Sequence, residues 1–76
     1  MDYLFEIKEH IGVLMERPSG WRKELNIVSW NGGAPKYDIR EWDEAHEKMT
    51  RGITLTEEEF AELVRLGSKR LNGESK

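Results

Sequence analysis

The sequence lacks cysteine altogether, holds only two prolines among its 76 residues, and has no long apolar run. Without cysteine there is neither a disulfide framework nor a thiolate metal site, and nothing indicates an oxidising compartment. No segment approaches the ~20 apolar residues that span a bilayer, and the N-terminus has no basic leader, so we expect a soluble cytoplasmic protein. A chain this short makes one domain, expected at residues 1–72 with a disordered tail at 73–76.

Patterns that would carry catalysis or bind a metal ion are also scarce. His10 and His46 are the only histidines, and neither belongs to a metal-ligand spacing, so both are expected to be surface residues. Asp43, Glu44 and Glu47 do not match a calcium loop and indicate a solvated acidic turn. We therefore expect no enzymatic activity, no cofactor and no metal site.

Alternation of apolar and polar residues predicts four strands, followed by a change of period that predicts one helix. Turn formers separate the first three strands, and an acidic loop at residues 43–48 precedes the fourth. The strands are expected at Phe5–Met15, Trp21–Trp30, Lys36–Trp42 and Met49–Leu55. The order ββββα predicts an α+β fold.

The helix has a well-defined start, because Thr56 and Glu59 have the spacing of a capping box, and Asn72-Gly73 is typical of a helix end. Its apolar stripe includes Gly67, which costs ~1 kcal/mol relative to Ala. Close packing against a second copy would offset that cost, although a glycine tolerated near the helix end is the alternative. The predicted dimer interface is Phe60, Leu63, Val64, Gly67 and Leu71.

The net charge of −3 counts against a nucleic-acid partner, because such binders usually carry a basic domain. The charge is unevenly distributed, however: residues 21–51 hold six cations and six acids, whereas residues 2–16 and 57–62 are mainly acidic. A basic groove is compatible with this middle segment, because the local field depends on which side chains share a face.

Three tryptophans lie near the ends of predicted strands and in polar company. Aromatic rings stack on unpaired bases while Lys and Arg neutralise phosphates, so this combination is typical of a surface for single-stranded nucleic acid. If Trp30 and Trp42 project from the face that carries Lys36 and Arg40, they form a stacking platform. At least one tryptophan is expected in the core, and a protein-binding sheet is an equally open alternative. The candidate binding residues are Trp21, Lys23, Trp30, Lys36, Arg40, Trp42 and Arg51.

The central motifs are Ile39-Arg40-Glu41-Trp42, then Lys48-x-x-Arg51-Gly52-Ile53-Thr54-Leu55, then an acidic helix start with Phe60. Their order and spacing resemble the positive cofactor four family of transcriptional coactivators. From about residue 4 to residue 71 the chain is similar to the bacterial YdbC-type members, for example in Gly20-Trp-Arg-Lys-Glu-Leu-Asn, Val28-Ser-Trp-Asn and Pro35-Lys-Tyr-Asp-Ile-Arg.

This resemblance implies a curved four-stranded antiparallel sheet with one C-terminal helix, dimerised through the helix, that binds single-stranded DNA across the sheet. It implies that Trp30 takes the place of a base-stacking aromatic, and that Arg40 and Arg51 take the places of family cations. Trp42 stands where the family has Tyr, and Asp43 replaces a Trp. In a bacterium it also implies association with the nucleoid.

We therefore expect a sequence-tolerant single-stranded DNA-binding homodimer, an accessory factor in transcription, replication or repair, with RNA as an open alternative ligand. Four phosphate contacts per protomer would give log K against log salt a slope of about −3. The alternative function is a protein-interaction module of the transcription machinery that does not contact nucleic acid.

Overall fold

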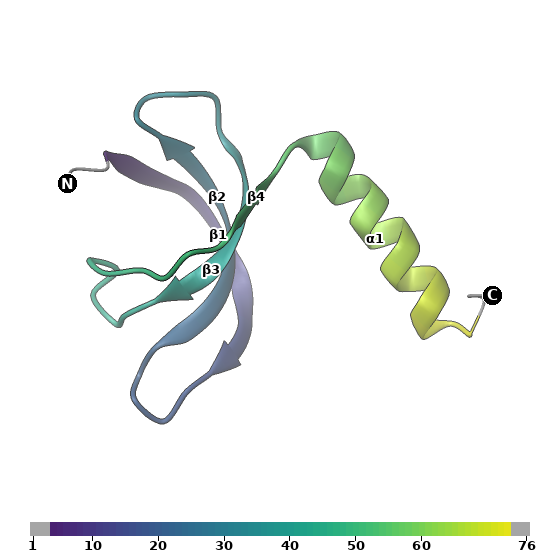
Figure 1. Ribbon diagram of the computed structural model, residues 1–76, viewed down its shortest axis with the longest axis horizontal. Helices are drawn as coiled ribbons and strands as arrows, with labels where there is room; N and C mark the ends of the chain where they lie inside the picture. The colour runs from purple at the N-terminus through teal and green to yellow at the C-terminus, as the bar shows by residue number, and fades with distance from the viewer. Residues whose placement is uncertain (1–3, 74–76) are drawn as a thin grey trace.

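The computed structural model describes residues 4–73, which form a four-stranded antiparallel sheet followed by one helix (Figure 1). The strands are adjacent in sequence order, β1 (Phe5–Glu16), β2 (Arg22–Trp30), β3 (Lys36–Trp42) and β4 (Ile53–Leu55), and the helix is α1 (Glu57–Leu71). The predicted α+β class and the ββββα order are confirmed, and the first three strands agree with the predicted bounds to within one residue. Of the predicted tail, all but Gly73 lies outside the described residues.

The fourth strand is shorter than predicted. Met49 forms only an isolated bridge with Trp42, and the regular ladder begins at Ile53. Between them the Thr50 hydroxyl, rather than a backbone carbonyl, accepts from the Glu41 amide at 3.1 Å. A side chain that takes the ladder's acceptor position interrupts regular pairing, which the alternation of residues in the sequence does not reveal.

The first strand is also less regular than its sequence pattern predicts. Its pairing with β2 contains three register shifts, the last between Val13 and Met15. Such bulges place one extra residue on the strand and break the strict two-residue period. Ile11, Val13 and Met15 are exposed on this edge strand.

The helix begins where its capping box predicts. The Thr56 hydroxyl accepts from the Glu59 amide at 3.1 Å, and the Glu59 carboxylate accepts from the Thr56 amide at 2.8 Å. The helix ends at Leu71 with Asn72 as its C-cap, followed by Gly73 with a φ of 77°. No helix in the described part of the chain is long and apolar enough to cross a membrane.

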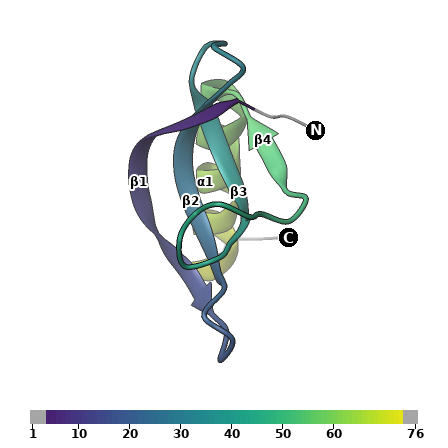
Figure 2. The same cartoon turned by 90° about the vertical axis from the view of Figure 1, so that its left-hand side faces the viewer.

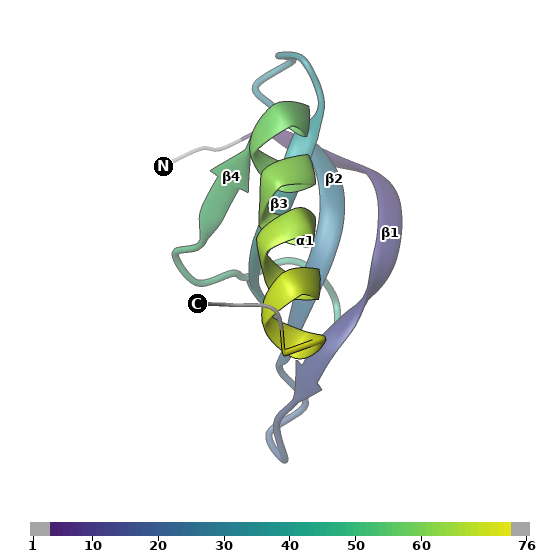
Figure 3. The ribbon, with the colours of Figure 1, turned by 90° about the vertical axis from the view of Figure 1, so that its right-hand side faces the viewer.

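The sheet has two chemically different faces. The outer face points toward α1, which lies behind β2 and β3 in Figure 2 and in front of them in Figure 3. On this side Tyr37 stacks on Phe60 of α1 with ring centroids 4.0 Å apart. We call the opposite side the inner face; the strand register places on it Phe5, Glu24, Asn26, Val28, Trp30, Lys36, Asp38, Arg40, Trp42 and Thr54.

The most buried side chains belong to the inner face, and most of them are polar. Val28 and Trp42 are the only fully buried apolar side chains among residues 4–73, whereas Glu24, Asn26 and Asp38 are also inaccessible to solvent. The helix contributes no buried residue. A single copy of this chain therefore folds around a small, largely polar core, while its apolar helix stripe stays in contact with solvent.

Gly52 fits only because it has no side chain. A Cβ at this position would lie 2.2 Å from the Ile39 carbonyl oxygen and 2.4 Å from the Arg40 Cβ. We predict that Gly52→Ala lowers the free energy of unfolding by about 1–3 kcal/mol, because β3 and the start of β4 must move apart. Urea denaturation measures the change.

The matched control is Gly12→Ala in β1, where an added Cβ meets no atom within 4 Å. This variant should be at least as stable as the parent, since Ala restricts the unfolded chain more than Gly does. Equal stability of Gly52→Ala and the parent would contradict the close packing at Gly52.

Candidate nucleic-acid interface

Trp30 is the last residue of β2 and lies on the inner face, opposite Phe5 of β1. The Trp30 and Phe5 rings are 5.9 Å apart in a tilted arrangement, and the Trp30 side chain is half-buried. The Arg40 guanidinium lies over the indole, 4.6 Å from the ring centroid. This cation–π contact fixes the indole between two strands and leaves it partly accessible.

The position of Arg40 is set by a buried carboxylate two residues earlier on β3. Asp38 Oδ1 accepts from Arg40 Nε at 2.6 Å, and Asp38 Oδ2 accepts from Arg40 Nη2 at 2.8 Å. Asp38 Oδ2 also accepts from the Thr54 hydroxyl of β4 at 3.0 Å. The charge of Arg40 is therefore already paired, so its contribution to the site is to hold Trp30 rather than to present an unpaired cation.

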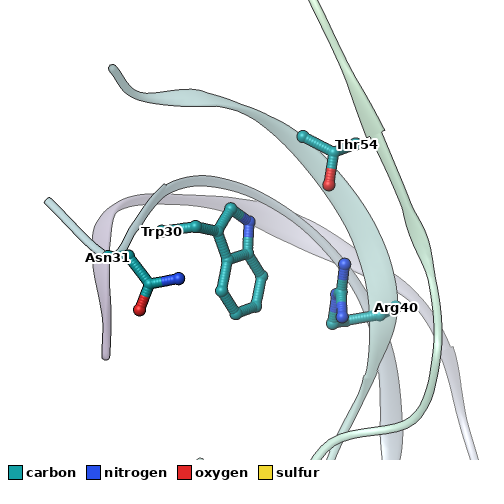
Figure 4. Close-up of a pocket in the computed structure, with 4 residues that line it drawn as sticks. All are labelled: Trp30, Asn31, Arg40 and Thr54. Carbon is teal, nitrogen blue, oxygen red and sulfur yellow. The ribbon is translucent and has the colours of Figure 1, made fainter. Parts of the chain in front are cut away.

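These side chains border a hollow of about 190 Å³ at the end of the inner face. Its walls are Trp30, Asn31, Arg40 and Thr54, and Figure 4 shows the indole between the Asn31 amide and the Arg40 guanidinium. We call this hollow the Trp30 pocket. It combines a flat aromatic surface with polar groups, a combination suited to a planar heterocyclic ligand.

The prediction that Trp42 stacks on bases is wrong for this structure. Trp42 does lie on the inner face, but its side chain is completely buried. Phe5 and His46 cover it, with ring centroids 5.1 Å and 5.6 Å away. The loop between β3 and β4 folds back over this end of the sheet, so Trp42 is the core tryptophan that the sequence led us to expect without saying which one it was.

The predicted cations fall into separate places. Lys36 is exposed on the inner face, the same face as Trp30. Lys23, in contrast, lies opposite Glu41 in the strand register and on the outer face, and its predicted role in phosphate binding stays a prediction. Lys23 and the exposed Arg51 line a second hollow of about 340 Å³, which Arg40 also borders.

Trp21, directly before β2, is half-buried and borders neither hollow, and its predicted role in binding stays a prediction.

The second buried carboxylate, Glu24, ties the loop between β3 and β4 to the sheet. His46 Nε2 lies 3.0 and 3.1 Å from its two oxygens, Asn26 Nδ2 donates to it at 3.0 Å, and Arg22 Nη2 lies 3.2 Å away. His10 reaches the same cluster through a 2.7 Å hydrogen bond to Asn26 Oδ1. His10 is exposed, as predicted, whereas His46 is half-buried, and both belong to this polar network.

The environment of Glu24 has opposing effects on its pKa. Burial raises the pKa, but hydrogen bonds from Asn26 and His46, together with the positive charge of His46 and His10, outweigh burial and leave the pKa below its ordinary value of 4.5. A lowered pKa means that Glu24 stabilises the fold fully above that ordinary value and loses this contribution as the pH falls through the folded-state pKa.

We predict that Glu24→Gln removes this part of the pH dependence. The difference in free energy of unfolding between the parent and Glu24→Gln should be largest near pH 6 and shrink as the pH falls toward 3. Chemical denaturation at a series of pH values measures it. Glu44→Gln is the control, because the exposed Glu44 forms no ion pair among residues 4–73; a constant difference for Glu24→Gln would contradict the prediction.

Three residues of this site were missed by reasoning from the sequence: Asn31, Asp38 and Thr54. Asn31 had a usable signal, since an Asn before Gly at a strand end is typical of a tight turn and follows Trp30 directly. Asp38 and Thr54 gave no such signal, because a polar residue on a predicted strand is ordinarily solvated. Only their pairing across β3 and β4 brings them together.

The fold and the site define a small sheet-and-helix domain with an aromatic pocket on the sheet face away from the helix. Comparison with known families agrees with this description: residues 17–66 match the family described as Transcriptional Coactivator p15 (PC4). The chain belongs to this family, which is associated with single-stranded DNA binding rather than with enzymatic activity. An uncharacterized protein of Treponema pallidum (strain Nichols) is 42% identical over 62 residues, which cover 82% of this chain and 73% of that protein.

Proposed function

We propose that this protein is a homodimer that binds single-stranded DNA, with little dependence on sequence, at the Trp30 pocket and the adjoining inner face. The observation that carries the proposal is the half-buried indole of Trp30, held by Arg40 at the border of an open hollow. An aromatic ring fixed in this way loses little conformational entropy when a base stacks on it.

The charge that this face presents to a ligand supports the proposal despite the net charge of −3. Two acids of the inner face, Glu24 and Asp38, are fully buried and paired with cations, so they do not present their charge directly to a ligand. Lys36 is exposed on the same face. Arg51 is exposed on the loop beside it. These two cations are the proposed phosphate contacts.

We predict that Trp30→Ala weakens binding of oligo-dT by about 1–3 kcal/mol, the contribution of one stacked base. Trp30→Phe should recover most of that loss, because it restores an aromatic face at the same position. Fluorescence anisotropy of a labelled oligonucleotide measures both affinities, and circular dichroism checks that the variants fold.

Two outcomes would contradict the proposed mechanism. One is an affinity for oligo-dT that does not change with salt, since phosphate contacts release counterions. The other is equally tight binding of duplex DNA, whose stacked bases cannot lie against Trp30. Loss of the fold in Trp30→Ala would show instead that the indole is a structural residue.

The dimer is proposed from the surface that α1 leaves uncovered. Leu63, Val64 and Leu71 are exposed along the apolar stripe of the helix, and Ile53 is exposed on the outer face. One copy buries too little apolar surface for a chain of this size, so a second copy packed on this side would supply the missing core. Gly67, where an added Cβ meets no atom within 4 Å, leaves room for close helix packing.

We predict that Val64→Glu converts a dimer into a monomer, because a carboxylate in the middle of the stripe would be buried without a partner. Sedimentation equilibrium measures the mass against 8.9 kDa per chain. Lys69→Glu is the control, since its position on the helix lies opposite the stripe and the same new charge there should leave the dimer intact. A monomeric parent protein would contradict the proposal.

A further inference from the structure

Asn31 occupies an unusual backbone position at the border of the Trp30 pocket. Its φ is 52°, in the left-handed region that Asn tolerates better than most residues, and Gly32 follows with a φ of 76°. The Gly33 amide donates to the Trp30 carbonyl at 2.8 Å and closes the turn. Positive φ at both central residues matches a type I′ turn, which fixes the place of Asn31 beside Trp30 at the start of the connection to β3.

The orientation of the Asn31 side chain is fixed by the neighbouring end of β1. The backbone N–H of Asn31 donates to the Leu4 carbonyl at 2.6 Å, and the backbone N–H of Leu4 donates to the side-chain oxygen Oδ1 of Asn31 at 3.1 Å. A backbone N–H can only donate, so the oxygen of the side-chain amide must face Leu4. The nitrogen, Nδ2, is then directed into the pocket toward Trp30, as Figure 4 shows.

The side-chain nitrogen of Asn31, Nδ2, has no hydrogen-bond acceptor among residues 4–73. Two other polar side chains of the pocket, Arg40 and Thr54, already donate to Asp38. Asn31 thus offers donors to a ligand while its own acceptor is occupied. Asn31 therefore differs from an Asn that recognises adenine, because that recognition uses the oxygen and the nitrogen of the side-chain amide together.

We propose that Asn31 makes the Trp30 pocket selective for bases with a keto group, thymine, uracil and guanine, over the amino-bearing bases cytosine and adenine. This inference deepens the proposed function and depends on it. A base that enters the pocket with its sugar outside presents the edge remote from the sugar. That edge carries O4 in thymine and uracil and O6 in guanine, which accept from Asn31 Nδ2, whereas cytosine and adenine present an amino group that leaves two donors facing each other.

The decisive comparison is oligo-dT with oligo-dC of equal length, because the two bases match in size and the strands match in charge. One hydrogen bond supports a preference of roughly five-fold for oligo-dT. Asn31→Gly, which keeps the left-handed backbone and removes the side-chain amide, should lower that ratio to about one, because it removes both the hydrogen bond to thymine and the opposed donors at cytosine. Anisotropy titrations at one salt concentration give all four affinities.

A second variant separates the donor from the rest of the side chain. Asn31→Asp retains an oxygen for the Leu4 amide but replaces the donor in the pocket by an acceptor, so it should reverse the preference toward oligo-dC even if binding of both strands weakens. Equal affinities of the parent for the two strands, or a preference that survives in Asn31→Gly, overturn the inference and leave the proposed function standing. Failure of the parent to bind either strand overturns both.

Discussion

The carboxylate of Asp38 is the group on which the candidate binding site depends. It is fully buried and accepts three hydrogen bonds, two from Arg40 on its own strand and one from Thr54 on β4. A buried charge is costly unless it is paired and hydrogen-bonded, so Asp38 requires both partners to stay in place. Arg40, held by Asp38, lies over the Trp30 ring and positions it. Thr54, held by the same carboxylate, helps to keep the short β4 paired with β3 at the edge of the sheet.

Glu24 plays a corresponding part at the other end of the inner face. Its carboxylate contacts His46, Asn26 and Arg22. The contact with His46 holds the loop between β3 and β4 over Trp42. The two carboxylates divide the inner face into a closed end, where an indole is sealed in the core, and an open end, where an indole borders a hollow. A polar core of this kind specifies strand register more strictly than apolar packing would, because each buried group needs a particular partner.

Much of the fold could be predicted from the sequence because its signals are local. The capping box at Thr56, the turn at Asn31-Gly32 and the alternation along β2 and β3 each depend on neighbouring residues, and the structure has all three. The predictions for β4 and β1 were less accurate, because contacts with residues far away in the sequence determine where these strands pair regularly. Thr50 interrupts the ladder by accepting a hydrogen bond from the Glu41 amide, and the register shifts of β1 arise in its pairing with β2.

The same division applies to the candidate site. The sequence by itself determined the family and the order of elements, because both follow from the order and spacing of local motifs. A two-residue period fixes the side of each residue within one strand, but only the pairing of β2 with β3 decides that Trp30 and Lys36 share a face. Only the tertiary structure decided that Trp42 is buried while Trp30 borders a pocket, that Arg40 is paired with Asp38, and that the oxygen of Asn31 is held by Leu4. Burial and hydrogen-bond partners come from segments far apart in the chain, so no local pattern of residues could distinguish one tryptophan from the other.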